Sequence, residues 1–461
     1  MKKVILILCL ILGNVCFAAE FTILHTSDTH GRISPVEYKG TKNQGGFSRR
    51  VTFVNEMRKQ NKNVLLLDSG DYFQGSLYYR LDYGKSGAKL LPYIRYDAIT
   101  LGNHEFDNGL KVLKRNIKES KTQFISANIH FNDRYLKKTV KPYITKTFDN
   151  EKVLIIGVTT SDLGNLANIN QIKVTNPIDE INKIIKEVPY DKLIILSHCG
   201  LDEDRQIAKA IPQITLILGG HNHYFFNTPE YVNGVPIIQD GEFGVRVGIT
   251  DFNKKLTKSS YEKITPTIPT NPQIDKKIAK LDNHAKKVTK QILATSEITL
   301  IGDQTTIEHS QTNLGKLVLV SMRRAFKNEK VDGIITNAGS IRINKNFKGD
   351  ITYANALEIL PFENNIVIVE IKGKYLKQVL QHGQQTNRRY LQYYLKDKNI
   401  DDNKTYKIIT NSYIATGKDG YEAFRHANII KQSNKKPVNI LKDTLLEMKV
   451  ITNDSLNLEN L

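Results

Sequence analysis

The sequence predicts a two-domain α/β protein, and three observations support this fold class. The chain has 461 residues, more than a single hydrophobic core usually supports. Short apolar runs alternate with amphipathic stretches, which is the pattern of layered α/β folds. Hydrophobic residues make up 40% of the chain and charged residues 25%, which is the composition of a folded soluble protein.

The first 19 residues predict a secretory signal peptide. Lys2 and Lys3 precede an apolar run at 4–12, and Ala18 or Ala19 provides a small residue for cleavage. This run is too short to span a membrane, so we expect no stable membrane insertion. The predicted location of the mature protein is therefore periplasmic or secreted.

The cysteines and the charge limit the partners that we expect. Only Cys199 remains after the predicted signal peptide, so no intramolecular disulfide is expected. The formal net charge of +19 falls to +17 without Lys2 and Lys3, because the removed segment contains no acid. Since the basic residues are dispersed, we expect no nucleic acid polymer as a partner and only a modest attraction for anionic substrates.

The first half of the chain contains seven apolar runs that have the length of buried strands. The predicted strands are 21–24, 64–67, 99–101, 124–127, 153–158, 193–196 and 214–218. Apolar residues at helical spacing predict helices at 47–58 and 177–188. The second of these helices has Pro177 at its start and acidic residues in its first turn, as helix starts commonly do.

The chain changes character near residue 251. Lysine-rich sequence is followed by three prolines within 265–272, where a regular ladder cannot continue. We interpret this region as a linker, followed by a connecting helix over 274–293. The second half then predicts helices at 313–326, 353–360 and 374–382 and strands at 333–336, 366–371 and 406–410. The predicted organisation is a signal peptide at 1–19, a first domain at 20–254, a linker and connecting helix at 255–295, and a second domain at 296–461.

Residues with metal-ligand side chains follow directly after five of the predicted strands. They are Asp28, His30, Asp71, Asn103, His104, His198, His221 and His223. The carboxyl ends of strands in a layered α/β fold meet in a common cleft, so we expect these residues to converge. Mixed oxygen and imidazole ligands suit Zn²⁺, Mn²⁺ or Fe, and one central carboxylate such as Asp71 can bridge two ions. His25, within the first strand, is expected to be a hydrogen-bonded core residue.

The segment 101–107 combines an amide, an imidazole and two carboxylates in one short turn. Asn103 offers a neutral oxygen to a metal ion. The neighbouring His104 is suited to act as an acid, a base or a charge stabiliser, and Asp107 can orient its ring. We interpret Glu105 either as a residue that supports the metal ligands without binding metal or as a structural residue.

These segments resemble the calcineurin-like metallophosphoesterase signature. The matching motifs are Asp28-x-His30, Gly70-Asp71, Gly102-Asn103-His104-Glu105, Ser197-His198 and Gly219-Gly220-His221-Asn222-His223. Together with its second half, the chain is similar to the secreted 5′-nucleotidase and UDP-sugar hydrolase family. The resemblance implies a four-layer metallophosphoesterase sandwich followed by a smaller α/β C-terminal domain.

The resemblance also implies two divalent metal ions, Zn, Mn or similar, and a catalytic pair. One ion would be held by Asp28, His30, Asp71 and His223, and the other by Asp71, Asn103, His198 and His221. His104 with Asp107 would form the catalytic dyad, and the protonated His104 would neutralise charge that develops on the phosphoryl oxygens.

The second half contains candidate substrate residues in turns that follow its strands. Arg342 offers a planar fork for phosphate or carboxylate, and a pair of facing aromatic rings can hold a flat base. The family resemblance implies that Phe362 and Tyr413 stack on the base. It implies further that Asn337 and Arg342 contact the substrate and that Asp419 binds the ribose.

The residues and the resemblance together predict a metal-dependent phosphoric monoester hydrolase. Its expected reaction is the hydrolysis of nucleoside 5′-phosphates to nucleoside and phosphate, with nucleoside di- and triphosphates or UDP-sugars as further candidate substrates. One alternative is a 2′,3′-cyclic nucleotide 2′-phosphodiesterase with 3′-nucleotidase activity. An alternative of another class is a non-catalytic secreted binding protein on the same scaffold.

Overall fold

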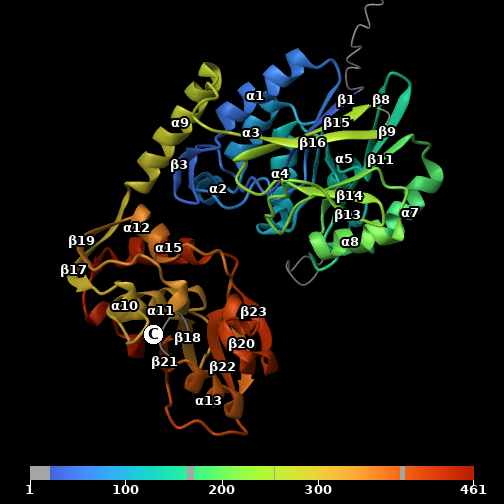
Figure 1. Ribbon diagram of the computed structural model, residues 1–461. Helices are drawn as coiled ribbons and strands as arrows, with labels where there is room; N and C mark the ends of the chain where they lie inside the picture. Colours follow the sequence, from blue (N-terminus) through green and yellow to red (C-terminus); the bar gives the residue numbers. More distant parts are fainter. Residues whose placement is uncertain (1–20, 164–170, 254, 385–389, 461) are drawn as a thin grey trace, which may run out of the picture. The chain divides into compact units, whose positions relative to one another are not determined.

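The structure, a computed structural model, describes residues 21–163, 171–253, 255–384 and 390–460. The predicted signal peptide at 1–19 lies outside this range. The chain forms two compact units, the first ending at Ala285 and the second beginning at Lys286 (Figure 1). Within the described ranges, we find no helix with both the length and the apolar character needed to cross a lipid bilayer.

Two six-stranded sheets form the centre of the first unit. The first sheet consists, in spatial order, of β16 (Lys255–Lys263), β15 (Arg246–Asn253), β1 (Phe21–Thr26), β4 (Val64–Asp68), β5 (Ala98–Thr100) and β6 (Phe124–Ile125). The second sheet consists of β13 (Glu230–Val232), β14 (Val235–Gln239), β12 (Leu216–Gly219), β11 (Lys192–His198), β9 (Glu151–Thr159) and β8 (Tyr143–Phe148). The strands β1, β4, β5 and β6 run parallel to one another, as do β9, β11, β12 and β14.

The two sheets pack on each other and carry helices on their outer faces. Side chains alternate along β4, so Leu65 and Leu67 pack against Ile194 and Leu196 of β11, whereas Leu66 points to the helices. The helices on the first sheet are α1 (Phe47–Gln60), α3 (Lys85–Ile94) and α4 (Gly109–Ser120), and those on the second are α7 (Pro177–Glu187) and α8 (Leu201–Ala210). Figure 1 shows the two sets on opposite sides of the strands. The predicted four-layer sandwich is therefore confirmed.

The remaining elements of this unit are short and lie in its connections. They are β2 (Val36–Tyr38), β3 (Thr41–Gln44), α2 (Leu77–Asp82), the 3₁₀ turn η1 (Asn103–Phe106), β7 (Ile129–Phe131), α5 (Arg134–Thr139) and β10 (Ile172–Val174).

The start of the predicted linker is wrong. Residues 255–263 form β16, which pairs antiparallel with β15. This strand lies at the sheet edge, where only one neighbour is needed and an exposed lysine such as Lys258 is tolerated. The connecting helix is present as α9 (Pro272–Thr289), which begins at a proline. It ends earlier than predicted, because β17 already begins at Ile292.

The second unit is a smaller α/β domain with two sheets. The five-stranded sheet has the order β21 (Leu391–Leu395), β18 (Gly333–Asn337), β22 (Thr405–Asn411), β20 (Ile366–Lys372) and β23 (Asn428–Gln432). The three-stranded sheet has the order β19 (Phe347–Thr352), β17 (Ile292–Leu300) and β24 (Val450–Ile451). The helices are α10 (Gln304–Ile307), α11 (Asn313–Ala325), α12 (Tyr353–Ile359), α13 (Gly373–His382), α14 (Ser412–Ala415) and α15 (Pro437–Met448).

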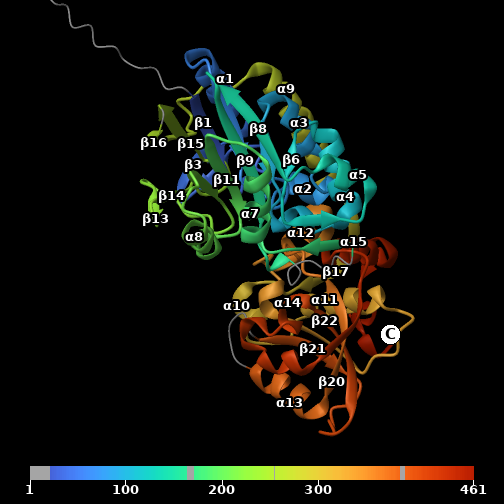
Figure 2. The same ribbon diagram turned by 90° about the vertical axis from the view of Figure 1, so that its right-hand side faces the viewer.

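The core of the second unit follows the predicted apolar strands. Ile335, Val367 and Ile408, from three neighbouring strands, pack with Leu376 and other residues of α13. Short 3₁₀ turns complete this unit at η2 (Ala338–Ser340), η4 (Lys418–Gly420), η5 (Glu422–His426), η6 (Asp454–Leu456) and η7 (Leu458–Asn460). Figure 2 shows its strands and helices in yellow, orange and red. The six elements predicted for this half are all present as α11, β18, α12, β20, α13 and β22.

Candidate active site

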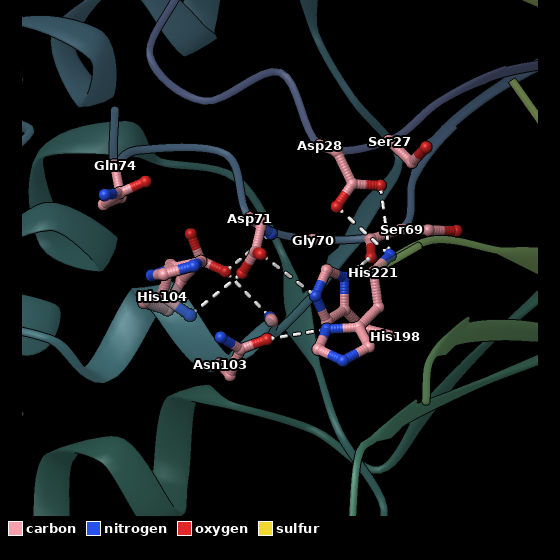
Figure 3. A network of polar contacts seen from close by, with 12 residues as sticks. Ser27, Asp28, Ser69, Gly70, Asp71, Gln74, Asn103, His104, His198 and His221 are labelled. Atoms are coloured by element: carbon pink, nitrogen blue, oxygen red, sulfur yellow. Dashed lines mark hydrogen bonds and ion pairs between the residues drawn. The ribbon is translucent and has the colours of Figure 1, made fainter. Parts of the chain in front are cut away.

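The predicted metal-ligand residues of the first unit converge where parallel strands of its two sheets end. Asp28 follows β1, Asp71 follows β4 and Asn103 follows β5, while His198 ends β11 and His221 follows β12. Figure 3 shows these side chains turned toward one another. The convergence has a simple cause, because neighbouring parallel strands bring their carboxyl ends to the same edge of a sheet.

One group of ligand atoms is formed by Asp28, His30 and His223, whose donor atoms lie within 4.8 Å of one another. Asp28 is fully buried, and its Oδ1 lies 3.4 Å from His223 Nε2. The Nε2 atoms of His30 and His223 approach to 3.1 Å. Two imidazole nitrogens and a carboxylate at these distances offer three lone pairs to one point, which suits a transition-metal ion.

A second group is formed by Asp71, His198 and His221, again with donor atoms within 4.8 Å. His198 Nε2 is buried and makes no hydrogen bond, although it lies 3.1 Å from Asp71 Oδ2. Asn103 adds its side-chain oxygen, which lies 2.9 Å from His221 Nδ1. An orphaned buried nitrogen beside a carboxylate and an amide oxygen fits a second ion.

The backbone is strained at these positions. Five of the seven predicted ligands have a positive φ, between 47° and 75°: Asp28, His30, Asp71, His221 and His223. Non-glycine residues adopt this region at a cost, and such residues cluster at functional sites. Gly102 is needed for a different reason, because a Cβ there would collide with the Asp71 carboxylate.

The carboxylates of the site favour positive charge in their neighbourhood. Burial by itself would lower the pKa of His198, but Asp71 outweighs burial and raises that pKa to about 10. Burial by itself would also lower the pKa of His223, but hydrogen bonds to Asp28 and Glu242 raise that pKa to about 10. The carboxylates therefore attract protons onto His198 and His223, whereas burial lowers the pKa of His30 and of His221. Two divalent cations would supply that charge instead and leave the imidazoles neutral, as metal ligation requires.

His104 and Asp107 lie beside these groups and contact each other. His104 Nδ1 is 2.9 Å from Asp107 Oδ2, and 37% of the His104 side chain is exposed. The backbone N–H of His104 donates to Asp71 Oδ1 at 2.9 Å, which ties the dyad to the second group. Burial would lower the pKa of His104, but the hydrogen bond to Asp107 and the nearby Asp71 raise it to about 9.

Glu105 supports the loops that carry two of the proposed metal ligands. Its carboxylate accepts hydrogen bonds from the backbone N–H groups of Asp71 (2.8 Å), Tyr72 (2.9 Å), Phe73 (3.3 Å) and Gly102 (2.7 Å). This one side chain therefore joins the loop that carries Asp71 to the loop that carries Asn103.

Two other residues that orient the ligands were missed from the sequence. Glu242 Oε2 lies 2.8 Å from His223 Nδ1, and Gln74 Oε1 lies 3.1 Å from His30 Nδ1. Such outer partners fix the tautomer and the orientation of a metal-binding histidine. Glu242 could have been found, because it follows shortly after β14 just as Asp28 follows β1. His25 is, as predicted, a buried core residue, hydrogen-bonded to Asp240 and Ser69 at 2.9 Å each.

The predicted substrate residues of the second unit form two sets of contacts. The Asp419 carboxylate accepts hydrogen bonds from Asn337 Nδ2 at 2.9 Å and from the Tyr413 hydroxyl at 3.0 Å. The guanidinium of Arg342 lies 6.0 Å from the ring centroid of Phe362. Phe362 is 46% exposed and Tyr413 is 38% exposed, so both rings can stack on a ligand.

Comparison with known proteins identifies two family matches and several similar proteins. Residues 21–225 match the calcineurin-like phosphoesterase family, and residues 291–395 and 386–426 match the 5′-nucleotidase C-terminal domain. The human 5′-nucleotidase is 28% identical, with 96% of this chain and 92% of the human protein covered. The trifunctional nucleotide phosphoesterase protein YfkN of Bacillus subtilis is 27% identical over 89% of this chain, but the chain spans only 32% of that protein.

Solved structures show the same fold. The 5′-nucleotidase precursor from Thermus thermophilus aligns with a TM-score of 0.67 and 28% identity, covering 94% of this chain and 97% of that chain. The NAD nucleotidase of Haemophilus influenzae aligns with a TM-score of 0.64 and 21% identity over the same shares of the two chains.

Proposed function

The chain belongs to the family that joins a calcineurin-like phosphoesterase domain to a 5′-nucleotidase C-terminal domain, and from this premise we propose that it hydrolyses nucleoside 5′-monophosphates to nucleoside and phosphate. It is a metal-dependent phosphomonoesterase. The observation that best supports the proposed reaction is the pair of carboxylate–histidine groups next to the His104–Asp107 dyad.

We propose the following ligands for two divalent ions. Asp28, His30, Asp71 and His223 would hold one ion, and Asp71, Asn103, His198 and His221 the other. When bound, such ions supply Lewis acidity toward a phosphoryl group and lower the pKa of a water molecule. Zn²⁺ or Mn²⁺ suits this donor set better than Mg²⁺ or Ca²⁺, because each ion would have two imidazole ligands beside its two oxygen ligands.

The residues of the chain then perform two tasks at the phosphoryl group. Asp107 holds Nδ1 of His104, which leaves Nε2 to donate a hydrogen bond to a phosphoryl oxygen as negative charge develops there. Glu105 keeps the loops of Asp71 and Asn103 at a fixed separation, so the donors do not have to reorganise during the reaction.

The second unit supplies the features that suit a nucleoside. Phe362 and Tyr413 would stack on the base, Asp419 would accept hydrogen bonds from the ribose hydroxyls, and Arg342 with Asn337 would contact polar groups of the substrate. The names of the relatives support nucleotides as the substrate class. Nucleoside di- and triphosphates and UDP-sugars are further substrates that we propose to examine.

We also propose the maturation and the domain limits that the sequence predicts. Removal of 1–19 would release a periplasmic or secreted protein, with the catalytic domain from residue 20 and the substrate domain from residue 296. Because residues 255–263 belong to the first sheet, we place the connection between the domains within 264–295.

A substrate panel tests the proposed function. The mature protein would be freed of metal, reconstituted with Mn²⁺, Zn²⁺ or Co²⁺, and assayed for phosphate release from 5′-, 3′- and 2′,3′-cyclic nucleotides. We expect 5′-monophosphates to be hydrolysed fastest. Faster hydrolysis of 3′- or cyclic nucleotides would favour the alternative phosphodiesterase activity.

A comparison of two variants tests the alternative that the protein is a non-catalytic binding protein. His104→Ala should abolish most phosphate release, while His130→Ala, which changes an exposed histidine of β7, should leave it unchanged. If no nucleotide is hydrolysed by the metal-loaded protein and the two variants behave alike, the protein is a binding protein on this scaffold.

A further inference from the structure

A small cavity lies in the first unit, away from the metal-ligand side chains but against the backbone that carries them. The volume open to the centre of a water-sized particle is about 10 Å³, and the lining includes Thr29, Arg32, Phe47, Arg50, Tyr72 and Leu90. Pockets for drug-sized ligands measure roughly 300–1,000 Å³. The cavity is therefore far too small for a nucleotide and has room for about one water molecule or one small ion.

The most unusual feature of the cavity wall is Arg50, a cation with unused hydrogen-bond donors. Only 2% of Arg50 is exposed. Its Nη2 donates to the backbone oxygen of Arg32 at 3.1 Å, whereas its Nε and Nη1 are buried without any hydrogen-bond partner. The Nε of Arg32 is likewise buried and unpartnered. In the described ranges of the chain, neither guanidinium forms an ion pair with a carboxylate.

The surroundings add to the positive charge. Arg80 acts on Arg32 as a like charge, and Glu242 acts on it as an opposite charge. Glu242 already bonds to His223 Nδ1 at 2.8 Å, so its charge is shared with the metal-ligand group. Two guanidiniums at one cavity thus lack a dedicated counter-charge.

Arg50 cannot easily turn elsewhere to find a partner. A Cβ at Gly244 would collide with its guanidinium, so the side chain lies directly on the backbone of that residue. Its Cζ also lies 5.8 Å from the ring centroid of Phe47. The side chain is therefore held between the backbone of Gly244 and the ring of Phe47, and Arg50 itself belongs to the cavity lining.

We propose that this cavity binds a small inorganic anion of the size of chloride, held by the guanidiniums of Arg50 and Arg32. A buried charge with unmade hydrogen bonds is strongly unfavourable unless it is paired. A water molecule would satisfy the donors but would leave the charge uncompensated. An anion satisfies the donors and also compensates the positive charge. Guanidinium groups bind anions well because their donors form a planar fork.

The position of the anion links it to the proposed metal centre. Thr29 lies between Asp28 and His30 in sequence, and the backbone around the cavity is joined by hydrogen bonds from His30 N to Asp71 O (2.9 Å) and from Gly31 N to Tyr72 O (2.7 Å). The anion would therefore stabilise the two loops that present three of the proposed ligands. This inference does not depend on which nucleotide the protein hydrolyses.

Bromide crystallography tests the occupant directly. Crystals of the full mature protein would be grown or soaked in sodium bromide, and anomalous scattering would be recorded at the bromine edge. We expect a peak in the cavity, in contact with Arg50 Nη1 or Nε. Density for an ordered water molecule without an anomalous peak, or no density, would overturn the proposal.

Thermal unfolding tests the same proposal in solution. At constant ionic strength, replacing sodium gluconate with sodium chloride should raise the Tm by a few degrees and should saturate, since gluconate is too large for the cavity. Arg50→Met should abolish this increase, while Arg58→Met on the same helix should retain it. An increase that does not saturate, or that persists in Arg50→Met, would reject the site. If Arg50→Met does not fold, two results test the proposal instead. They are the saturation of the chloride-dependent increase in the Tm of the wild-type protein and the outcome of the bromide experiment.

Discussion

Replacing Glu105 by Gln should loosen the proposed metal centre although Glu105 is not among the proposed ligands. Oε1 accepts from Tyr72 and Phe73, and Oε2 accepts from Asp71 and Gly102. A glutamine amide can replace only one of these oxygens as an acceptor, because its NH₂ group would face two N–H donors. Two hydrogen bonds to a charged acceptor are lost, each worth about 1.5–3 kcal/mol.

The net effect should be smaller than the sum of the two bonds. Burial and the nearby Asp71 raise the pKa of Glu105 to about 7, so holding its charge in the wild-type protein already costs free energy that glutamine avoids. We expect about 2–4 kcal/mol of destabilisation, which corresponds to a decrease in Tm of several degrees for the first unit. Metal affinity should fall about 10- to 100-fold, as is typical when an outer partner of a metal site is removed.

Scanning calorimetry of the metal-free protein and titration calorimetry with Mn²⁺ or Zn²⁺ would measure the two effects. Glu56→Gln is the matched control, because Glu56 lies on the surface, where it forms an ion pair with Lys59. That control should change stability by less than about 0.5 kcal/mol. If Glu105→Gln matched the control in both stability and metal affinity, the role that we assign to Glu105 would be refuted.

Four further outcomes follow from the structure. His104→Ala and Asp107→Asn should each lower kcat by about 10²- to 10⁴-fold in steady-state assays, because a positioned donor is lost or misoriented; unchanged kcat would exclude the dyad. Asp71→Asn should weaken the binding of both ions in metal titrations, whereas loss of one ion alone would contradict a bridging role. Tyr413→Ala should raise KM about 5- to 150-fold through lost stacking, and an unchanged KM would remove Tyr413 from the substrate site. Chelation followed by Mn²⁺ addition should abolish and restore phosphate release, and activity that survives chelation would argue against metal dependence.

Most of the fold could be predicted from local sequence, because strongly apolar runs have few alternatives to a buried strand. The runs at 64–67, 153–158 and 193–196 became β4, β9 and β11, and they are buried in the contact between the two sheets. The prediction failed at β16, whose lysines are typical of a solvent-exposed segment. Its strand conformation comes from pairing with β15, a contact that local sequence does not reveal.

In the candidate site, too, some residues could be predicted from local sequence and others depend on contacts between distant segments. Residue type and position after a strand were enough to select Asp28, Asp71, His198 and His221 as candidate ligands that lie close together, because parallel strands bring such residues together whatever their separation in sequence. Their partners were harder to find. Gln74 and Glu242 become important only because each lies next to one histidine ring, and this proximity depends on how two distant loops pack.

The sequence by itself determined the chemistry that this protein can perform, since carboxylates, imidazoles and an amide placed after strands leave few uses other than metal binding. It also determined the two-unit α/β architecture, because hydrophobic periodicity is a local property of the chain. Only the tertiary structure decided which donors meet in which group, that one glutamate joins the loops of Asp71 and Asn103, and that Arg50 is buried without a counter-charge. These features depend on distances between segments far apart in sequence, and such distances are set by packing and not by local composition.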